Sequence, residues 1–230
     1  MSQSVKCALF DLDGTLVSTG GAGAEALDRA IEQLYGIANA MRAIDPQGKT
    51  DPRIIREIFA QNLKRDCGPN ELFAVQKLYL EFLREECANA DKYQVLNGVR
   101  ELLEQLQNKN VLLGLGTGNI EAGARIKLER ADLNTYFPFG GYGSDSEERS
   151  ELLRIGAEKA EKHGQVNLRP DNIFVIGDTH RDILAAKKAG FKVIALASGN
   201  STVRELEPYN PDHLFADCAN VNALLRIICG

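Results

Sequence analysis

Two carboxylates with a single residue between them follow an apolar segment near the start of this 230-residue chain. In the stretch CALFDLDGTLV (7–17), Asp11 and Asp13 come directly before Gly14 and Thr15. Charge beside a buried core is costly unless a partner compensates it. Side chains alternate along an extended chain, but a turn after Asp11 can bring the carboxylate of Asp13 back to the same pocket. The spacing therefore indicates a polar site at the end of a strand.

Two other interpretations of this stretch need no catalysis. It can be a tight Asp-Gly turn whose side chains cap a helix. It can also be a calcium loop of the EF-hand type, but Leu16 then stands where glycine is needed and Ala22 where glutamate is needed. The pattern D-x-D-G-T after an apolar segment is much narrower than Asp-Gly alone, and it favours a chemical role.

Further along the chain, two more apolar segments end in polar residues. The segment NIFVIGD ends in Asp178, and Asp182 follows four residues later. Asp182 has an alternative interpretation as a helix cap or first-turn acid. The segment at 111–119 ends in Thr-Gly-Asn and does not match a dinucleotide-binding fingerprint, because its last glycine is missing. In a doubly wound sheet, ligands bind beyond the carboxyl ends of the strands, and clustered carboxylates there favour Mg²⁺.

The elements that must position these residues can be predicted from apolar patterning. Strands are expected at 5–10, 111–117, 172–178 and 191–197, each followed by a helical pattern. This alternation predicts an α/β fold with a doubly wound, Rossmann-like parallel sheet covered on both faces. Residues 18–95 contain helical patterns without convincing strands, and Asp51-Pro52 is expected to start a helix as cap and first residue. We therefore expect an α/β core of residues 1–17 and 96–230 and an inserted α-helical cap domain of residues 18–95.

From Val5 to its C-terminal helix, the chain resembles the haloacid dehalogenase superfamily, whose first signature is D-x-D-G-T after a strand. The resemblance implies that Asp11 is the nucleophile, which forms an aspartyl-phosphate. It implies that Asp13 protonates the leaving alcohol and later accepts a proton from water. It also implies a Mg²⁺ ion held by Asp11, the backbone carbonyl of Asp13 and Asp178, with Asp182 further out or steering the ion.

The resemblance also assigns the residues that hold the phosphoryl group. Thr117 would be the phosphate-binding hydroxyl, with Gly118 and Asn119 as further donors. The family needs a Lys or Arg to neutralise the phosphoryl charge, and the usual Lys-Pro pair is missing here. Arg149, before an expected helix, is the best candidate and Arg154 the second, although Arg149 can also be a solvated residue in a charged turn.

Substrate contacts are expected from two further places. Thr15 lies beside the carboxylate pair and can hold the turn there by hydrogen bonding. Lys49 and Thr50 lie in a loop of the inserted unit, just before a helix. The resemblance implies that such cap residues reach over the substrate and select the leaving group. A surface loop lysine is the alternative for Lys49.

The presence of an acid at Asp13 favours cleavage of a C–O–P bond, since the departing oxygen needs a proton. With a helical cap, the chain looks like a phosphatase of the phosphoglycolate phosphatase type, acting on a small phosphorylated metabolite. A phosphosugar mutase similar to β-phosphoglucomutase would use the same residues. A non-catalytic phosphate-ligand binding protein on the same fold is the third possibility.

Composition limits the partners of the protein. The net charge is −5, so no broad basic field is available to attract nucleic acid or an anionic membrane. The 5 cysteines form no C-x-x-C pair, which suits reduced thiols in a cytoplasmic protein. No apolar run approaches the roughly 20 residues of a membrane span, and no signal peptide is evident. The sequence leaves the oligomeric state open.

Overall fold

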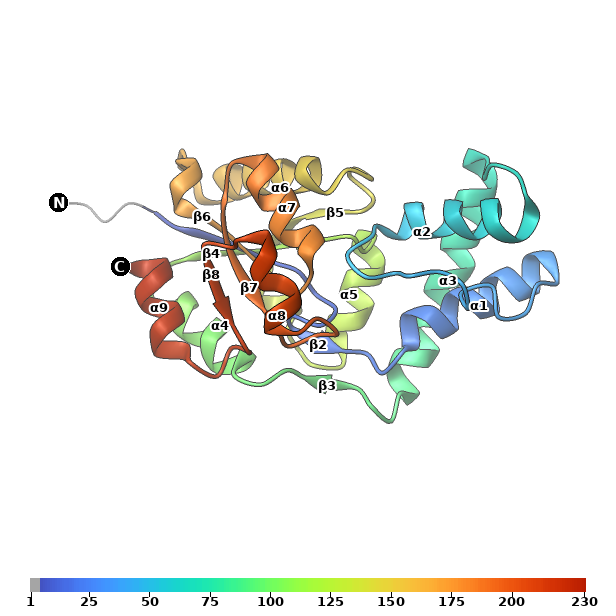
Figure 1. The fold of residues 1–230 in the computed structure, drawn as a ribbon, viewed down its shortest axis with the longest axis horizontal. Helices are drawn as coiled ribbons and strands as arrows, with labels where there is room; N and C mark the ends of the chain where they lie inside the picture. Colours follow the sequence, from blue (N-terminus) through green and yellow to red (C-terminus); the bar gives the residue numbers. More distant parts are fainter. Residues whose placement is uncertain (1–4) are drawn as a thin grey trace.

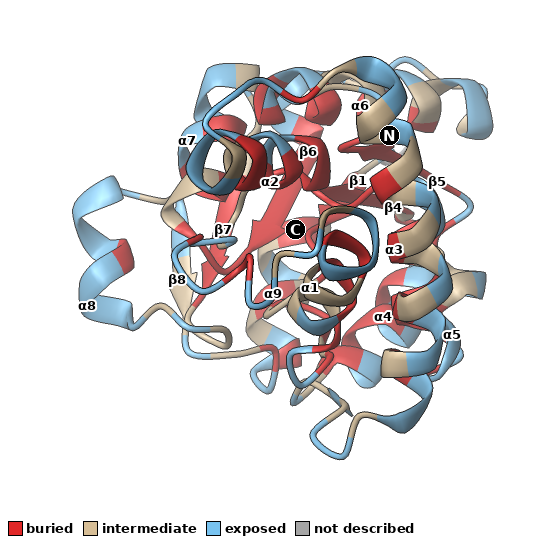
Figure 2. Ribbon diagram, turned by 90° about the vertical axis from the view of Figure 1, so that its right-hand side faces the viewer, coloured by how far each residue is buried: buried red, intermediate tan, exposed pale blue. Residues whose placement is uncertain are grey.

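The computed structural model describes residues 5–230 of the chain. A six-stranded sheet lies at its centre, with the strand order β5-β4-β1-β6-β7-β8 and all neighbours parallel (Figure 1). Its strands are β1 (Cys7–Phe10), β4 (Leu112–Thr117), β5 (Phe139–Tyr142), β6 (Ile173–Gly177), β7 (Lys192–Leu196) and β8 (His213–Phe215). The strands β1, β4 and β6 are almost wholly buried (Figure 2). The expected α/β fold with a doubly wound parallel sheet is confirmed.

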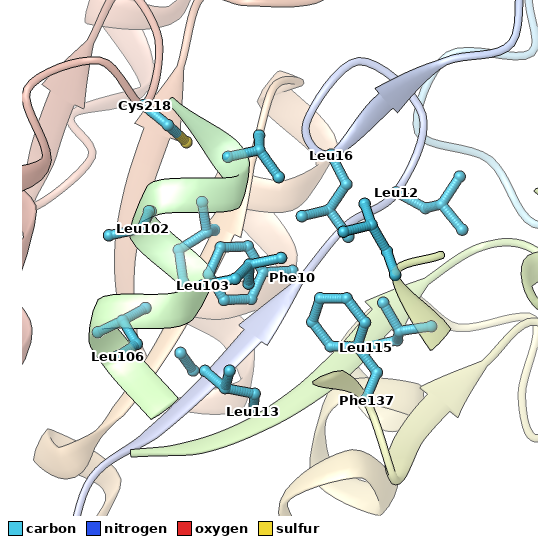
Figure 3. Close-up of a cluster of buried hydrophobic side chains, with 14 of the residues drawn as sticks. Phe10, Leu12, Leu16, Leu102, Leu103, Leu106, Leu113, Leu115, Phe137 and Cys218 are labelled. Carbon is cyan, nitrogen blue, oxygen red and sulfur yellow. The ribbon is translucent and has the colours of Figure 1, made fainter. Parts of the chain in front are cut away.

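Helices cover both faces of this sheet because its strands alternate their apolar side chains. In β1, Ala8 and Phe10 belong to one buried cluster with Leu103 and Leu106, which lie on the helix just before β4, as Figure 3 shows for the labelled residues. Cys7 and Leu9 belong to a second cluster on the other face. The covering helices are α4 (Val99–Asn108), α5 (Glu121–Glu129) and α9 (Val221–Cys229) on the first face and α6 (Arg149–Gly164) and α7 (His180–Ala189) on the second. A short helix, α8 (Val203–Leu206), follows β7.

Of the helices between β1 and β4, the first three form a separate group at the end of the molecule opposite α9 (Figure 1). They are α1 (Ala22–Tyr35), α2 (Asp51–Ile58), which continues as a π-helical turn over Phe59–Leu63, and α3 (Pro69–Asn89). Their apolar faces share a buried cluster of their own, to which Ile126 of α5 also belongs. Two short strands, β2 (Val17–Ser18) and β3 (Gln94–Val95), pair antiparallel where the chain leaves the sheet and returns to it. This ribbon lies at the two boundaries expected for the insertion, whose status as a cap domain stays a prediction.

Two edge strands and one helix start differ from the expectation. Strand β5 has the sequence FGGY, whose glycines give no alternation of apolar and polar side chains. Glycine is needed at 141 because a Cβ there would overlap the backbone of Leu152 in α6. The short strand β8 lies at the other edge of the sheet and also lacks a signal. Thr50, and not Asp51, is the N-cap of α2, so the expected cap at Asp51 is wrong by one residue.

Within residues 5–230, no helix combines the length and the apolar character that a membrane crossing requires. The 5 cysteines are free thiols.

Candidate active site

The carboxyl ends of three neighbouring strands meet at one place in the sheet. Asp11 follows β1 and its backbone N–H donates to Ile176 O of β6 at 2.8 Å, which extends the strand pairing by one residue. Thr117 ends β4, and Asp178 comes directly after β6. All three side chains are buried. Parallel strand order therefore brings together residues that lie between 61 and 167 positions apart in the sequence.

Three carboxylates and one guanidinium form the charged centre of this place. Asp11, Asp178 and Asp182 each offer one oxygen within 4.8 Å of the others. Arg149, the first residue of α6, pairs with Asp182 Oδ1 and lies 3.6 Å from Asp11 Oδ1. Burial, with repulsion from Asp182, raises the pKa of Asp11 to about 7, although Arg149 opposes the shift. Burial and its two carboxylate neighbours also raise the pKa of Asp178. The cluster therefore holds more negative charge than Arg149 can balance.

Asp182 combines the two roles that the sequence left open. Its Oδ2 accepts hydrogen bonds from Thr179 N at 3.0 Å and Thr179 Oγ1 at 2.7 Å, which completes a capping box at the start of α7. Its Oδ1 accepts from Arg149. Because both oxygens are already engaged, Asp182 is better suited to hold Arg149 in place than to bind a ligand directly.

The remaining oxygens fit a hard divalent cation such as Mg²⁺. Carboxylate and carbonyl oxygens are the ligands that this ion prefers, and Asp11 and Asp178 bring two buried carboxylates close together. The Asp178 side chain is oriented by Thr15, whose Oγ1 donates a hydrogen bond to its Oδ1 at 3.3 Å. Gly14, with a φ of +80°, and Gly199 pass so close to Asp178 that a Cβ on either would overlap its carboxylate. The tight backbone therefore fixes the Asp178 carboxylate, which lines the cavity together with Asp11.

Thr117 and its two followers form the next part of the site. Asn119 Nδ2 donates to Thr117 Oγ1 at 2.9 Å and to Asp13 Oδ2 at 2.9 Å. Gly118 passes under the inserted unit, since its carbonyl accepts from Asp51 N at 2.8 Å and an added Cβ would overlap the carbonyl of Lys49. The Asn119 side chain thus orients Thr117 and Asp13, and its expected role as a phosphate donor stays a prediction.

A buried lysine near Asp13 has no place in the motifs read from the sequence. Lys127 of α5 donates from Nζ to Asp13 Oδ2 at 2.6 Å. Burial lowers the pKa of Lys127, but attraction by Asp13, Tyr79 and Asp51 outweighs it and the pKa is raised overall. The signal that could have found Lys127 is its helical spacing, because it falls on the buried face of α5, four residues after Gly123.

Asp51 joins the inserted unit to the same centre. Its Oδ2 accepts a hydrogen bond from Ile120 N at 2.8 Å, at the start of α5. Burial raises the pKa of Asp51 to about 6, while Lys127 and the Ile120 hydrogen bond act in the opposite direction. The contact fixes the start of α2 against the start of α5, three residues after Thr117.

These residues face a cavity of about 430 Å³ between the sheet and the inserted helices. Asp11, Asp13, Thr117, Gly118, Asn119, Lys49, Lys127, Arg149 and Asp178 are among its lining residues. Two residues expected to bind substrate do not line it: Thr15 is fully buried beneath Asp178, and Thr50 is buried as the cap of α2. Arg154, the second candidate for the phosphoryl cation, instead lies on the surface beside Glu151 at 3.2 Å.

The sequence was also compared with known proteins. The sequence model of the haloacid dehalogenase-like hydrolases matches residues 8–196. The chain belongs to this family. It is 28% identical over 232 residues to a probable phosphatase, IndB, of Dickeya dadantii, a match that covers 95% of this chain and 94% of the relative. It is 28% identical to a phosphoglycolate phosphatase of Pseudomonas syringae, with 92% of this chain and 76% of the relative covered. A solved hydrolase structure, also from Pseudomonas syringae, has the same fold, with a TM-score of 0.74 over 98% of this chain and all (100%) of that chain at 21% identity.

Proposed function

We propose that this haloacid dehalogenase-like hydrolase is a Mg²⁺-dependent phosphatase, which cleaves a small phosphorylated metabolite through an aspartyl-phosphate on Asp11. The observation that carries the proposal is the meeting of Asp11, Asp178 and Arg149 at one end of the cavity. The curated phosphatases among its relatives support the reaction class. The cavity volume of about 430 Å³ supports a small substrate.

In this reaction, an oxygen of Asp11 attacks phosphorus and forms a new P–O bond as the bond from phosphorus to the ester oxygen breaks. Asp13 gives its proton to that departing oxygen, which leaves as an alcohol. A water then attacks the phosphoryl group and gives a proton to Asp13, and Asp11 is released with inorganic phosphate. Thr117 and the Gly118 and Asn119 backbone bind phosphoryl oxygens, and Arg149 balances their charge.

The ion would be held by Asp11, the backbone carbonyl of Asp13 and Asp178. When bound, it lowers the repulsion between an anionic nucleophile and an anionic phosphoryl group. Asp182 keeps Arg149 beside Asp11, and Thr15 orients Asp178. The role of these two residues is therefore one of positioning and not of substrate contact.

Residues 18–95 act in this proposal as a cap that closes over the cavity and excludes water. The loop before α2 supports this role, since Lys49 lines the cavity and its carbonyl lies against Gly118. A cytoplasmic location, expected from the cysteine pattern, agrees with the free thiols.

The test measures phosphate release from a panel of small phosphorylated metabolites, with Mg²⁺ and with EDTA, for the unaltered chain and for Asp11→Asn. We expect Mg²⁺-dependent release that falls at least about 10³-fold in the variant, because the nucleophile is lost. Asp91→Asn on an exposed loop serves as the matched control and keeps full activity. Release that persists in Asp11→Asn would contradict the mechanism. Conversion of hexose 1-phosphates without phosphate release would indicate a mutase.

A further inference from the structure

The carboxylate of Asp13 accepts its side-chain hydrogen bonds on one oxygen, Oδ2. Lys127 Nζ donates to Oδ2 at 2.6 Å, and Asn119 Nδ2 donates to the same oxygen at 2.9 Å. Within residues 5–230, both donors that reach this carboxylate end on Oδ2. The side chain of Asp13 is 42% exposed and lines the cavity, while that of Lys127 is 6% exposed. The carboxylate is therefore held from the protein side and open on the cavity side.

Both donors are fixed by their own surroundings. Asn119 Nδ2 is shared with Thr117 Oγ1 at 2.9 Å, which sets the plane of the amide. Lys127 rises from the buried face of α5 into a niche below α1, where a Cβ on Gly23 would lie 3.3 Å from its ammonium and 3.9 Å from the hydroxyl of Tyr79. The position of Asp13 thus depends on two rigid groups outside the D-x-D-G-T motif.

We propose that Lys127, together with Asn119, is a positioning residue that turns Asp13 so that Oδ1 faces the leaving-group oxygen. The inference rests on the proposed function. Two N–H donors occupy Oδ2, so Oδ1 is the oxygen of this carboxyl group that is left for the cavity and the leaving group. A general acid must lie within hydrogen-bond reach of the atom that it protonates. Lys127 therefore determines how well the enzyme expels leaving groups that need a proton.

A structural lysine and a positioning lysine differ in how they respond to the leaving group. Phenyl phosphate and 4-nitrophenyl phosphate share one ring and one phosphoryl group, but nitrophenolate departs readily without a proton. Loss of the general acid, which contributes about 10²- to 10⁴-fold where protonation is needed, therefore affects phenyl phosphate far more. A lysine that only stabilises the fold would lower the rates for both esters alike.

The experiment compares the rates of hydrolysis of both esters, with Mg²⁺, for the full chain and its Lys127→Met variant. We expect kcat for phenyl phosphate to fall about 30-fold, as part of the general-acid contribution, and kcat for 4-nitrophenyl phosphate to fall less than about threefold. KM is expected to stay unchanged for both, since Lys127 does not touch the phosphoryl group. Lys159→Met, which breaks a Lys–Asp pair at 2.8 Å on α6, is the matched control and leaves both rates unchanged.

Two further variants complete the test. Asn119→Ala removes the second donor, and we expect the same preference for the nitrophenyl ester, so that poor folding of Lys127→Met does not decide the result. In the Asp13→Asn background, Lys127→Met is expected to cause no further loss on phenyl phosphate, because the two residues act as one unit. Equal losses on both esters, or additive losses in the double variant, would overturn the inference. If the unaltered chain hydrolyses neither ester nor any metabolite of the panel, the proposed function itself fails.

Discussion

The two ends of the cavity are built from different materials. At the phosphoryl end, strand ends and the start of α6 bring together buried charges, among them Asp11, Asp178 and Arg149. At the other end, α1, α2 and the segment around β2 supply mostly apolar side chains and glycines, such as Leu27, Ile54 and Gly21. Ion pairs and hydrogen bonds therefore position the residues at the sheet end. Non-directional apolar packing positions those at the helical end.

This difference separates the reaction from its specificity. Buried charges tolerate little change, because each one left unpaired costs several kcal/mol. Apolar lining residues tolerate exchanges of similar size at a cost below about 1.5 kcal/mol. Under the proposed function, selection among leaving groups can therefore change at the helical end while the chemistry at the sheet end stays the same.

The largest effect is expected at the charged end. Arg149→Met leaves Asp11 and Asp182 facing each other without their cation, which should lower the free energy of unfolding by about 3–5 kcal/mol. It should also lower kcat about 10²- to 10³-fold, because a donor to the phosphoryl charge is lost. Urea unfolding in EDTA and steady-state rates with Mg²⁺ measure the two effects.

Arg154→Met is the matched control for this variant. Arg154 lies on the same helix, is 41% exposed and pairs with Glu151. We expect a loss of less than about 1 kcal/mol, as for other surface pairs, and no change in kcat. If the two variants behave alike, Arg149 is not the cation that balances the cluster.

The second effect concerns Asp51, which joins the two ends. Its pKa is raised from 3.8 to about 6 in the folded protein, so the folded state binds this proton more tightly than the unfolded state. The resulting stability, worth about 3 kcal/mol, is present below about pH 4 and is lost as the pH rises through about 6. Asp51→Asn removes this loss. From urea unfolding at pH 4, 5, 6 and 7, we expect the variant to gain stability relative to the unaltered chain as the pH rises. The opposite trend would mean that attraction by Lys127 outweighs burial.

The third effect is the response to magnesium. The excess of carboxylates at the charged end predicts that Mg²⁺ stabilises the folded chain, by about 2.7 kcal/mol at one hundred times its Kd. Thermal unfolding with Mg²⁺ and with EDTA measures this shift independently of activity. Asp178→Asn should remove the shift. A shift that survives in Asp178→Asn would place the ion elsewhere.

Sequence patterns led to the charged end much more readily than to the other. Asp11, Asp178 and Arg149 lie at strand ends or helix starts, where short motifs carry both the residue type and its placement. Long apolar strands predicted the centre of the sheet, but the edge strand β5 is short and glycine-rich, so periodicity missed it.

The rest required three-dimensional information. Lys127 reaches Asp13 across 114 positions in the sequence, and no local pattern indicates which acid a buried lysine will meet. Thr50 and Thr15 have hydroxyls that could bind a phosphate, but both residues are buried and neither lines the cavity. Residue type and spacing therefore predicted which groups gather near the cavity, while packing determines which of them line it.

The smallest effect is expected at the helical end, where Lys49 lines the cavity. Its ammonium is held by Glu57 at 2.5 Å, so only part of its charge acts on a bound phosphate ester. Lys49→Met should raise KM by less than about tenfold, or 1.4 kcal/mol, and leave kcat within a factor of about two. Arg53→Met is the control, because Arg53 also pairs with Glu57, at 3.3 Å, but is 60% exposed and is not among the residues that line the cavity. A large fall in kcat for Lys49→Met would mean that the helical end touches the reacting atoms, and the separation of chemistry from specificity would fail.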